Sequence, residues 1–430
     1  MSVTEPDTTE PDTTEPDMGA GPLSNLRVLE IGDEQGQFCA KLLADLGADV
    51  IKIEPPGGNA SRAIGPFLDD VEDPNASLSF WYYNTSKRAI TLDVTAAPGR
   101  DVFVTLAANA DLIVESLPPG FLPGLGLGYE TLCEANPGLV MCSITPFGQT
   151  GPWRDYLSAD LLHMAAGGQM ASCGYDEEDA PGSMPIAPGG GNAWHMGGHY
   201  AYMGIMAALV ARTMNGCGQY IDVSIHQACA LTTEAAVPAY VYRGEVLRRQ
   251  TGRHHGANKS PRTQFLAEDG RYLTALIANQ LSPRLVERLA DMMEPYGMAA
   301  DLRDPRYQDA ATVKAASEHI IEEVVGAFIA SRPAEESYHL AQSHGFTWGA
   351  VRPAEALLDD PHMADRGFWK TVHHPEHDRS IVYPGEAAIY SATPWRISRR
   401  APLVGEHNDA ILGQELGLSD EDIARLIASD

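Results

Sequence analysis

The sequence lacks the short motifs by which many cofactor and nucleophile sites are identified. No GxGxxG follows the first expected strand, and no P-loop, GxSxG or HExxH occurs. Nicotinamide, P-loop and serine-hydrolase chemistry are therefore disfavoured. The six cysteines form no CxxC pair in a chain of 430 residues, which argues against a zinc ribbon and against a disulfide framework.

Positive charge is also scarce, since 30 Lys and Arg stand against 58 Asp and Glu, for a net charge of −28. An acidic surface repels nucleic acid and anionic membranes, so neither is an expected partner. No stretch approaches the roughly 18 apolar residues of a membrane span. We expect a cytoplasmic protein with reduced thiols.

An acidic repeat near the N-terminus carries part of the negative charge. Residues 4–17 read TEPDTTEPDTTEPD and hold six acids, with no aromatic or branched aliphatic residue. Such a segment cannot bury enough apolar surface to offset the entropy of ordering, so we expect residues 1–22 to form a disordered tail. The segment fits neither a signal peptide nor a basic transit peptide.

Apolar runs alternate with helical spacing from residue 23 to about 150. Strands are expected at 27–31, 49–53, 89–94, 111–114 and 139–144, with helices at 37–46, 100–108 and 129–135. This alternation is typical of an α/β fold with a doubly wound, Rossmann-like parallel sheet. The chain exceeds the roughly 250–300 residues at which one core stops growing, so a second, smaller α+β domain is expected.

Changes in composition suggest the domain organisation. We assign a large domain to residues 23–225, a polar and basic linker to 226–262, and a small domain to 263–345. Residues 346–430 are expected to return as a linker and a C-terminal segment that completes the large domain.

Asp160 is notable for its position. Residues 158–172 predict a helix with Ser158 as its N-cap, shortly after the loop FGQTGP at 147–152. Acids are favoured in a first turn simply by the helix macrodipole. The alternative is a carboxylate nucleophile beside backbone N–H donors that stabilise an oxyanion during acyl transfer. The residues alone leave both interpretations open.

His195 and His199 form HxxxH at helical spacing, so one metal ion could meet both. No third ligand stands near them in the sequence. We therefore expect histidines that pack or form hydrogen bonds, and no metal site.

Longer motifs carry a resemblance over about residues 24–430. They include LRVLEIG (26–32), LLADLGADVIKIEPPGG (42–58), NTSKRAITLDV (84–94), ADLIVESLPPG (110–120), NPGLVMCSITPFGQTGP (136–152), SADLL (158–162) and PLVGEHNDAIL (402–412). In this order they resemble the class III CoA-transferases, a group that includes formyl-CoA:oxalate and carnitine CoA-transferases and is related to the α-methylacyl-CoA racemases. The resemblance implies an acyl-CoA thioester and a free carboxylic acid as substrates, with no tightly bound cofactor.

The resemblance also implies roles for individual residues. Asp160 would attack the thioester and pass through an aspartyl anhydride to an aspartyl-CoA thioester. By motif match, the CoA contacts would be Glu34, Gln35, Pro55, Asn84, Lys87, Arg88, Ser116 and Leu117. Lys87 and Arg88 would supply local positive charge, unless they form a solvated surface pair. An interlocked homodimer is expected, and a heteromer with a related subunit is the alternative.

Two other functions stay open, and the first is an α-methylacyl-CoA racemase or another acyl-CoA isomerase. The racemase branch places a His directly before the aspartate, where this chain has Ala159. Proton transfer at an α-carbon needs two acid/base groups, so the missing His favours the transferase. The second alternative is a non-catalytic CoA-binding subunit of a heteromeric transferase, against which the presence of Asp160 argues.

Overall fold

A computed structural model describes residues 21–277 and 281–427, so the acidic repeat at 4–17 lies outside the described residues. The chain divides into two compact units. Unit 1 contains the described residues up to Asp155, together with Gly198–Val223 and the chain from Gly367 onward. Unit 2 contains Tyr156–Gly197 and Ser224–Arg366.

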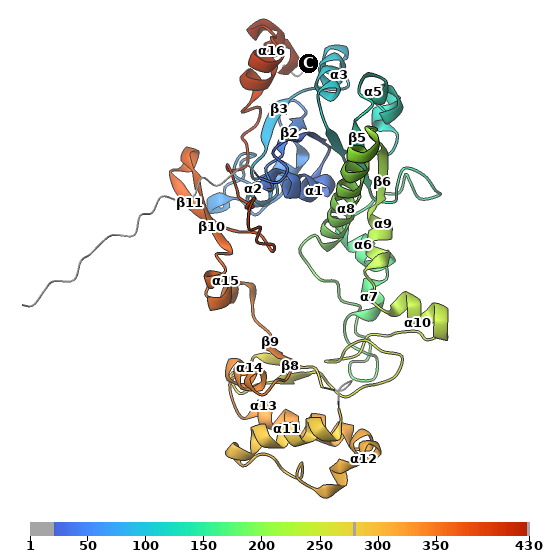
Figure 1. Cartoon of the computed structure of the whole chain (residues 1–430), viewed down its shortest axis with the longest axis vertical. Coiled ribbons are helices and arrows are strands. Elements are labelled where there is room, and N and C mark those ends of the chain that lie inside the picture. The colour runs from blue at the N-terminus through green and yellow to red at the C-terminus, as the bar shows by residue number, and fades with distance from the viewer. Residues whose placement is uncertain (1–20, 278–280, 428–430) are drawn as a thin grey trace, which may run out of the picture. The chain divides into compact units, whose positions relative to one another are not determined.

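Unit 1 is built on a six-stranded sheet with the order β3-β2-β1-β4-β5-β6 (Figure 1). Its strands are β1 (Arg27–Ile31), β2 (Asp49–Glu54), β3 (Arg88–Thr91), β4 (Leu112–Glu115), β5 (Val140–Thr145) and β6 (Tyr220–Ser224). β1 pairs in parallel with both β2 and β4, and the β2–β3 and β4–β5 pairs are parallel too. This is the strand order of a Rossmann-type doubly wound sheet, so the predicted fold class is confirmed.

Helices of unit 1 cover both faces of the sheet. They are α1 (Glu34–Asp45), α2 (Leu78–Tyr83), α3 (Ala97–Ala108), α4 (Phe121–Gly124), α5 (Tyr129–Ala135), α16 (Asp420–Ile427) and the part of α8 (Asn192–Asn215) from Gly198 onward. On one face, apolar strand residues such as Leu29 and Ile113 pack against Phe103 of α3 and Leu132 of α5. No described helix combines the length and apolar character needed to cross a membrane.

The other face of the sheet carries charged side chains in its interior. Glu30 of β1 lies directly opposite Lys52 of β2 in the strand register, and its Oε1 accepts from Lys52 Nζ at 3.0 Å. Lys87, which precedes β3, approaches the other carboxylate oxygen of Glu30 to 2.7 Å. All three side chains are buried. A charge inside an apolar strand is costly unless it is paired, so these three residues stabilise the sheet only together.

The C-terminal segment returns to unit 1. The antiparallel hairpin of β10 (Trp369–His374) and β11 (Arg379–Pro384) packs with Phe80 and Trp81 of α2. Farther along, Asn408 accepts a hydrogen bond from the backbone N–H of Thr91 at 2.8 Å. This contact lies at the edge strand β3, so the end of the chain covers an edge that would otherwise be open.

Unit 2 contains an antiparallel sheet of β7 (Gln264–Leu266), β8 (Tyr272–Ala275) and β9 (Trp348–Ala350). Its helices are α6 (Asp160–Ala166), α7 (Gln169–Ser172), α9 (Ile225–Leu231), α10 (Ala236–Arg243), α11 (Pro283–Met293), α12 (Ala310–Ala315), α13 (Gly326–Ala330), α14 (Ala334–Ser343) and α15 (Pro361–Asp365). Leu273, Leu289, Ile321, Phe328 and Trp348 are among the buried residues of the core that joins this sheet to its helices.

The helix predicted at 158–172 is divided. α6 ends before Gly167, and Gly168 has φ +99°, a left-handed conformation that breaks the helix before α7 begins. The prediction of Ser158 as N-cap is also wrong. The capping position is Ala159, which has no side-chain oxygen to offer, so Asp160 becomes the first helical residue.

The buried charges of the sheet generate a stability prediction. Glu30→Gln keeps the size of the side chain but leaves Lys52 and Lys87 buried without their carboxylate, and we expect a loss of about 3–5 kcal/mol in the free energy of unfolding. Urea denaturation measures this loss. Glu415→Gln is the control: Glu415 pairs with Arg27 and Arg88 while partly exposed, and we expect a loss of at most about 1 kcal/mol. Equal losses for the two variants would contradict the role assigned to Glu30.

Candidate active site

A crevice of about 260 Å³ opens in unit 1 where four neighbouring strands end. Its walls come from the residues that follow β1, β2, β3 and β4, and they include Gly32, Asp33, Pro55, Asn59, Asp93, Thr95, Ser116 and Leu117. Doubly wound sheets bind their ligands beyond the carboxyl ends of the strands, at the point where the strand order reverses. In this sheet that point lies between β1 and β4.

The chain turns tightly where β1 passes into α1. Gly32 has φ +128°, and a Cβ on it would lie 2.3 Å from Ser116 Oγ. The backbone N–H of Asp33 donates to Ser116 Oγ at 2.9 Å, and the Asp33 carboxylate caps α1 by accepting from the Gln35 N–H at 3.1 Å. These contacts hold the end of β4 against the N-terminus of α1, where backbone N–H groups and the helix dipole favour an anion.

The structure separates the predicted CoA contacts into two groups. Five lie at or beside the crevice: Pro55, Ser116 and Leu117 line it, and Glu34 and Gln35 form the first turn of α1. Asn84, Lys87 and Arg88 do not line the crevice.

Lys87 and Asn84 lie beneath α1, away from solvent. Besides its ion pair with Glu30, Lys87 donates to the Gln37 carbonyl at 3.1 Å and to Asn84 Oδ1 at 3.0 Å. Burial lowers the pKa of Lys87 to about 8. Burial alone would raise the pKa of Glu30, but the charges of Lys52 and Lys87 lower it overall. Lys87 is therefore a buried residue that joins β1 to α1, and it is not part of a solvated surface pair.

Arg88 is also occupied by carboxylates of the chain itself. Its guanidinium pairs with Asp49 and with Glu415, each at 2.6 Å. It is not a free cation for a phosphate, so any attraction for an anionic ligand at the crevice must come mainly from backbone N–H groups.

Asp160 begins α6 in unit 2 and is half-buried. Its Oδ1 accepts a hydrogen bond from the backbone N–H of Ala193 at 2.7 Å. Ala193 lies in the first turn of α8, a helix of 24 residues, and the N-terminus of a long helix carries partial positive charge. The carboxylate is thus oriented by a backbone donor, with its second oxygen directed away from that bond.

Two titratable side chains near Asp160 have pKa values shifted toward their uncharged forms. His163 is buried one turn later in α6, and burial, together with His226, lowers its pKa to about 4. Burial raises the pKa of Cys229 to about 11, and the nearby charge of Asp160 adds to the effect. The protonated thiol of Cys229 is a weak competitor for an electrophile, and Asp160 is the anionic group among these three side chains.

The break between α6 and α7 serves the packing around this cluster. A Cβ on Gly167 would lie 2.7 Å from Cys229 Cβ, so only glycine lets α6 approach α9 this closely. Gln169 of α7 donates to the Cys229 carbonyl at 2.5 Å and to Thr232 Oγ1 at 2.9 Å. α7 is thereby fixed to the same helix that borders Asp160.

His199 packs edge-on against Phe38 within unit 1, with ring centroids 4.9 Å apart. Neither His195 nor His199 belongs to a group of at least three candidate metal ligands among the described residues. Among the described residues, Glu234, His254 and His255 bring one ligand atom each within 4.8 Å of one another, an arrangement that can accept a transition-metal ion. This group was not predicted from the sequence, because Glu234 stands 20 positions before His254.

Comparison with known proteins gives consistent matches across the chain. The sequence model of CoA-transferase family III matches residues 23–408. Succinyl-CoA:(R)-benzylsuccinate CoA-transferase subunit BbsE of Thauera aromatica is 35% identical over 399 residues, which are 90% of this chain and 93% of the relative. Succinyl-CoA–D-citramalate CoA-transferase of Chloroflexus aurantiacus is 32% identical, over 95% of this chain and 97% of the relative.

A solved structure agrees with these sequence matches. A CaiB/BaiF family protein from Brucella suis superposes with a TM-score of 0.78 at 26% identity. The match covers 92% of this chain and 100% of that protein.

Glu115 provides a pH-dependent test of the crevice. It ends β4, where it accepts from the Leu117 N–H at 2.7 Å, and burial raises its pKa from 4.5 to about 7. Because the folded-state pKa is raised, the protonated carboxyl favours folding. This contribution is full below about pH 4.5 and is lost as the pH rises through about 7.

We therefore expect Glu115→Gln to gain stability relative to the wild type as the pH rises from 5 to 8, by up to about 3 kcal/mol. Urea denaturation at each pH measures the difference between the two proteins. Glu130→Gln, at an exposed position of α5, should show no such trend. A constant difference between wild type and Glu115→Gln across this range would rule out the buried, protonated carboxyl.

Proposed function

The chain belongs to CoA-transferase family III, and on that basis we propose that Asp160 is the nucleophile of its reaction. The enzyme transfers CoA from an acyl-CoA thioester to a free carboxylic acid. The observation that carries the proposal is the Asp160 carboxylate, held by the Ala193 N–H at the start of α8, near His163 and Cys229, whose uncharged forms are favoured.

The proposed reaction begins with attack by the free carboxylate oxygen of Asp160 on the thioester carbonyl. The C–S bond breaks, CoA leaves as a thiolate, and an acyl-aspartyl anhydride remains. The thiolate then attacks the Asp160 carbonyl of the anhydride, which releases the donor acid as its carboxylate and leaves an aspartyl-CoA thioester. No net proton is taken up or released in these steps, so no general base is required.

The second half of the reaction reverses the first with a different acid. The acceptor carboxylate attacks the aspartyl-CoA thioester and expels the thiolate, forming a new anhydride. Attack of the thiolate on the acceptor's acyl carbon gives the new acyl-CoA and restores Asp160. A carboxylate is a weak nucleophile, so its efficiency must come from positioning and from stabilisation of the charge that develops in each tetrahedral intermediate.

For CoA itself we propose the crevice at the strand ends of unit 1. Lys87 and Arg88 are both engaged by carboxylates, so the nucleotide part of CoA would depend on the N–H groups at the start of α1 and on the apolar wall around Leu117. The curated relatives named above are succinyl-CoA-dependent, and we propose a succinyl-type donor for this enzyme. A homodimer, or a heteromer with a related subunit, is the proposed assembly.

Replacing Asp160 tests the nucleophile. We expect Asp160→Ala and Asp160→Asn to lower kcat by at least about a thousandfold, because the covalent path is removed. Transfer between succinyl-CoA and a panel of acids, followed by mass spectrometry, measures the loss. Asp155→Asn, an exposed acid five positions earlier, should keep wild-type turnover.

Covalent trapping gives a second readout. Hydroxylamine added to the wild type during turnover should convert Asp160 to a hydroxamate. The nucleophile assignment fails if Asp160 stays unmodified while another residue carries the hydroxamate.

A bulky residue at the crevice tests the CoA site. We expect Leu117→Trp to fill the crevice and to raise the KM for the acyl-CoA by about tenfold or more, a loss of about 1.4 kcal/mol of binding. Val104→Trp, at an exposed position of α3, is the matched control and should leave this KM unchanged. An unchanged KM in Leu117→Trp, with the fold intact by circular dichroism, would place CoA elsewhere.

A further inference from the structure

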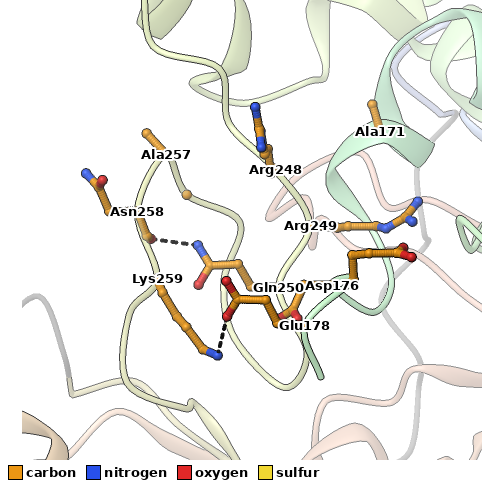
Figure 2. A pocket seen from close by; sticks show the side chains of 11 residues that line it. Ala171, Asp176, Glu178, Arg248, Arg249, Gln250, Ala257, Asn258 and Lys259 are labelled. Atoms are coloured by element: carbon orange, nitrogen blue, oxygen red, sulfur yellow. Dashed lines mark hydrogen bonds and ion pairs between the residues drawn. The ribbon is translucent and has the colours of Figure 1, made fainter. Parts of the chain in front are cut away.

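A second cavity, of about 470 Å³, lies within unit 2 (Figure 2). It is formed by α7, the loop that follows it, and the segment from Arg248 to Lys259. Its lining mixes charges of both signs: three acids at positions 176–178 face Arg248, Arg249 and Lys259 across the cavity. Whether such a cavity attracts anions depends on which of these charges are already engaged.

The acids are engaged. Asp176 accepts from the backbone N–H groups of Asp179 at 2.7 Å and Thr251 at 3.0 Å, and these bonds lower its pKa to about 2. Glu177 accepts from the Gly182 N–H at 3.0 Å. Glu178 pairs with Lys259 at 3.0 Å, as the dashed line in Figure 2 shows.

The two arginines are not engaged by acids. Arg249 donates to the Ser183 carbonyl at 3.0 Å, which is a neutral acceptor. The side chain of Arg248 makes no hydrogen bond or ion pair with any described residue. Both guanidinium groups border one cavity, and no described carboxylate is paired with either of them.

We infer that this cavity binds a free carboxylate of the substrate, the one at the end away from the reacting group. The inference rests on the proposed function, since it assigns the enzyme a dicarboxylic acid as donor, acceptor or both. A guanidinium group presents parallel N–H donors that match a carboxylate, and such charge-assisted pairs are stronger than neutral hydrogen bonds.

The cavity belongs to the same packed cluster as Asp160. Ala171 of α7 lines the cavity, and α7 follows α6, which begins with Asp160. Gln169 of α7 is bonded to the carbonyl of Cys229, the residue whose pKa is raised by the charge of Asp160. In this proposal one carboxylate of a dicarboxylic acid takes part in the chemistry at Asp160, and the other is recognised by Arg248 and Arg249.

Steady-state kinetics with matched substrates tests the inference. Wild type, Arg248→Gln and Arg249→Gln would be assayed with succinyl-CoA or butyryl-CoA as donor and with glutarate or butyrate as acceptor. We expect each variant to raise the KM of the dicarboxylic partner by about tenfold, the loss expected for a charge-assisted hydrogen bond. The KM of butyryl-CoA and butyrate, and kcat, should stay within about twofold.

The carboxylate bound in the cavity belongs either to the donor or to the acceptor, and the substrate whose KM rises tells the two apart. An increase for succinyl-CoA alone assigns the cavity to the donor, and an increase for glutarate alone assigns it to the acceptor. Arg243→Gln is the matched control, because Arg243 pairs with Glu245 at the surface and does not line this cavity. Its kinetic constants should equal those of the wild type.

A substitution with the opposite sign strengthens the test. Glu178→Gln removes the nearer of the two carboxylates paired with Lys259, which keeps its contact with Asp179. The loss of one negative charge from the cavity should lower the KM of the dicarboxylic partner. A general loss of folding could not produce that result. Isothermal titration of the wild-type chain with succinate, compared with butyrate, reports binding without turnover, and only succinate should bind measurably.

The inference is overturned if the KM of dicarboxylic and monocarboxylic substrates changes equally, if neither changes, or if succinate binding is unaffected in Arg248→Gln. These outcomes differ from failure of the proposed function, in which the wild type would transfer CoA between no donor and acid of the panel.

Discussion

The Glu30 carboxylate, buried between Lys52 and Lys87, is the interaction on which the arrangement of unit 1 depends. It joins the middle of β1 to the middle of β2 and to the residue that leads into β3. Lys87 extends the connection to the Gln37 carbonyl of α1. A buried charge is stable only when its partners are in place. The ion pairs of Glu30 therefore fix the register of β1, β2 and β3 and the position of α1 at the same time.

The crevice follows from that register. Because the strands are parallel and in register, their carboxyl ends lie at the same edge of the sheet. Pro55, Ser116 and the start of α1 therefore surround one opening. The C-terminal segment reinforces the arrangement, since Asn408 bonds to the edge strand and Glu415 joins Arg27 to Arg88. Segments more than 300 residues apart in the sequence thus stabilise the same sheet.

The sequence was informative where a local pattern determines the structure. The strand and helix periodicity predicted β1 to β5 and the helices α1, α3 and α5. Ser116 and Leu117, which the family resemblance named as CoA contacts, line the crevice. The ion pair between Arg88 and Glu415 could not be predicted from a local pattern, because the two residues are 327 positions apart. A signal for the buried triad did exist: Glu30 stands within the apolar run VLEI and Lys52 within the apolar run VIKI. The break in the helix predicted at 158–172 could not be predicted either. It depends on the left-handed conformation of Gly168, which composition alone does not specify.

The hydrogen-bond donor to Asp160 is a main-chain amide, and this affects how the site responds to amino-acid substitution. Any codon change at Ala193 that does not introduce proline retains the N–H group. A substitution of a neighbouring side chain therefore leaves this donor in place, even where it changes the walls around the carboxylate.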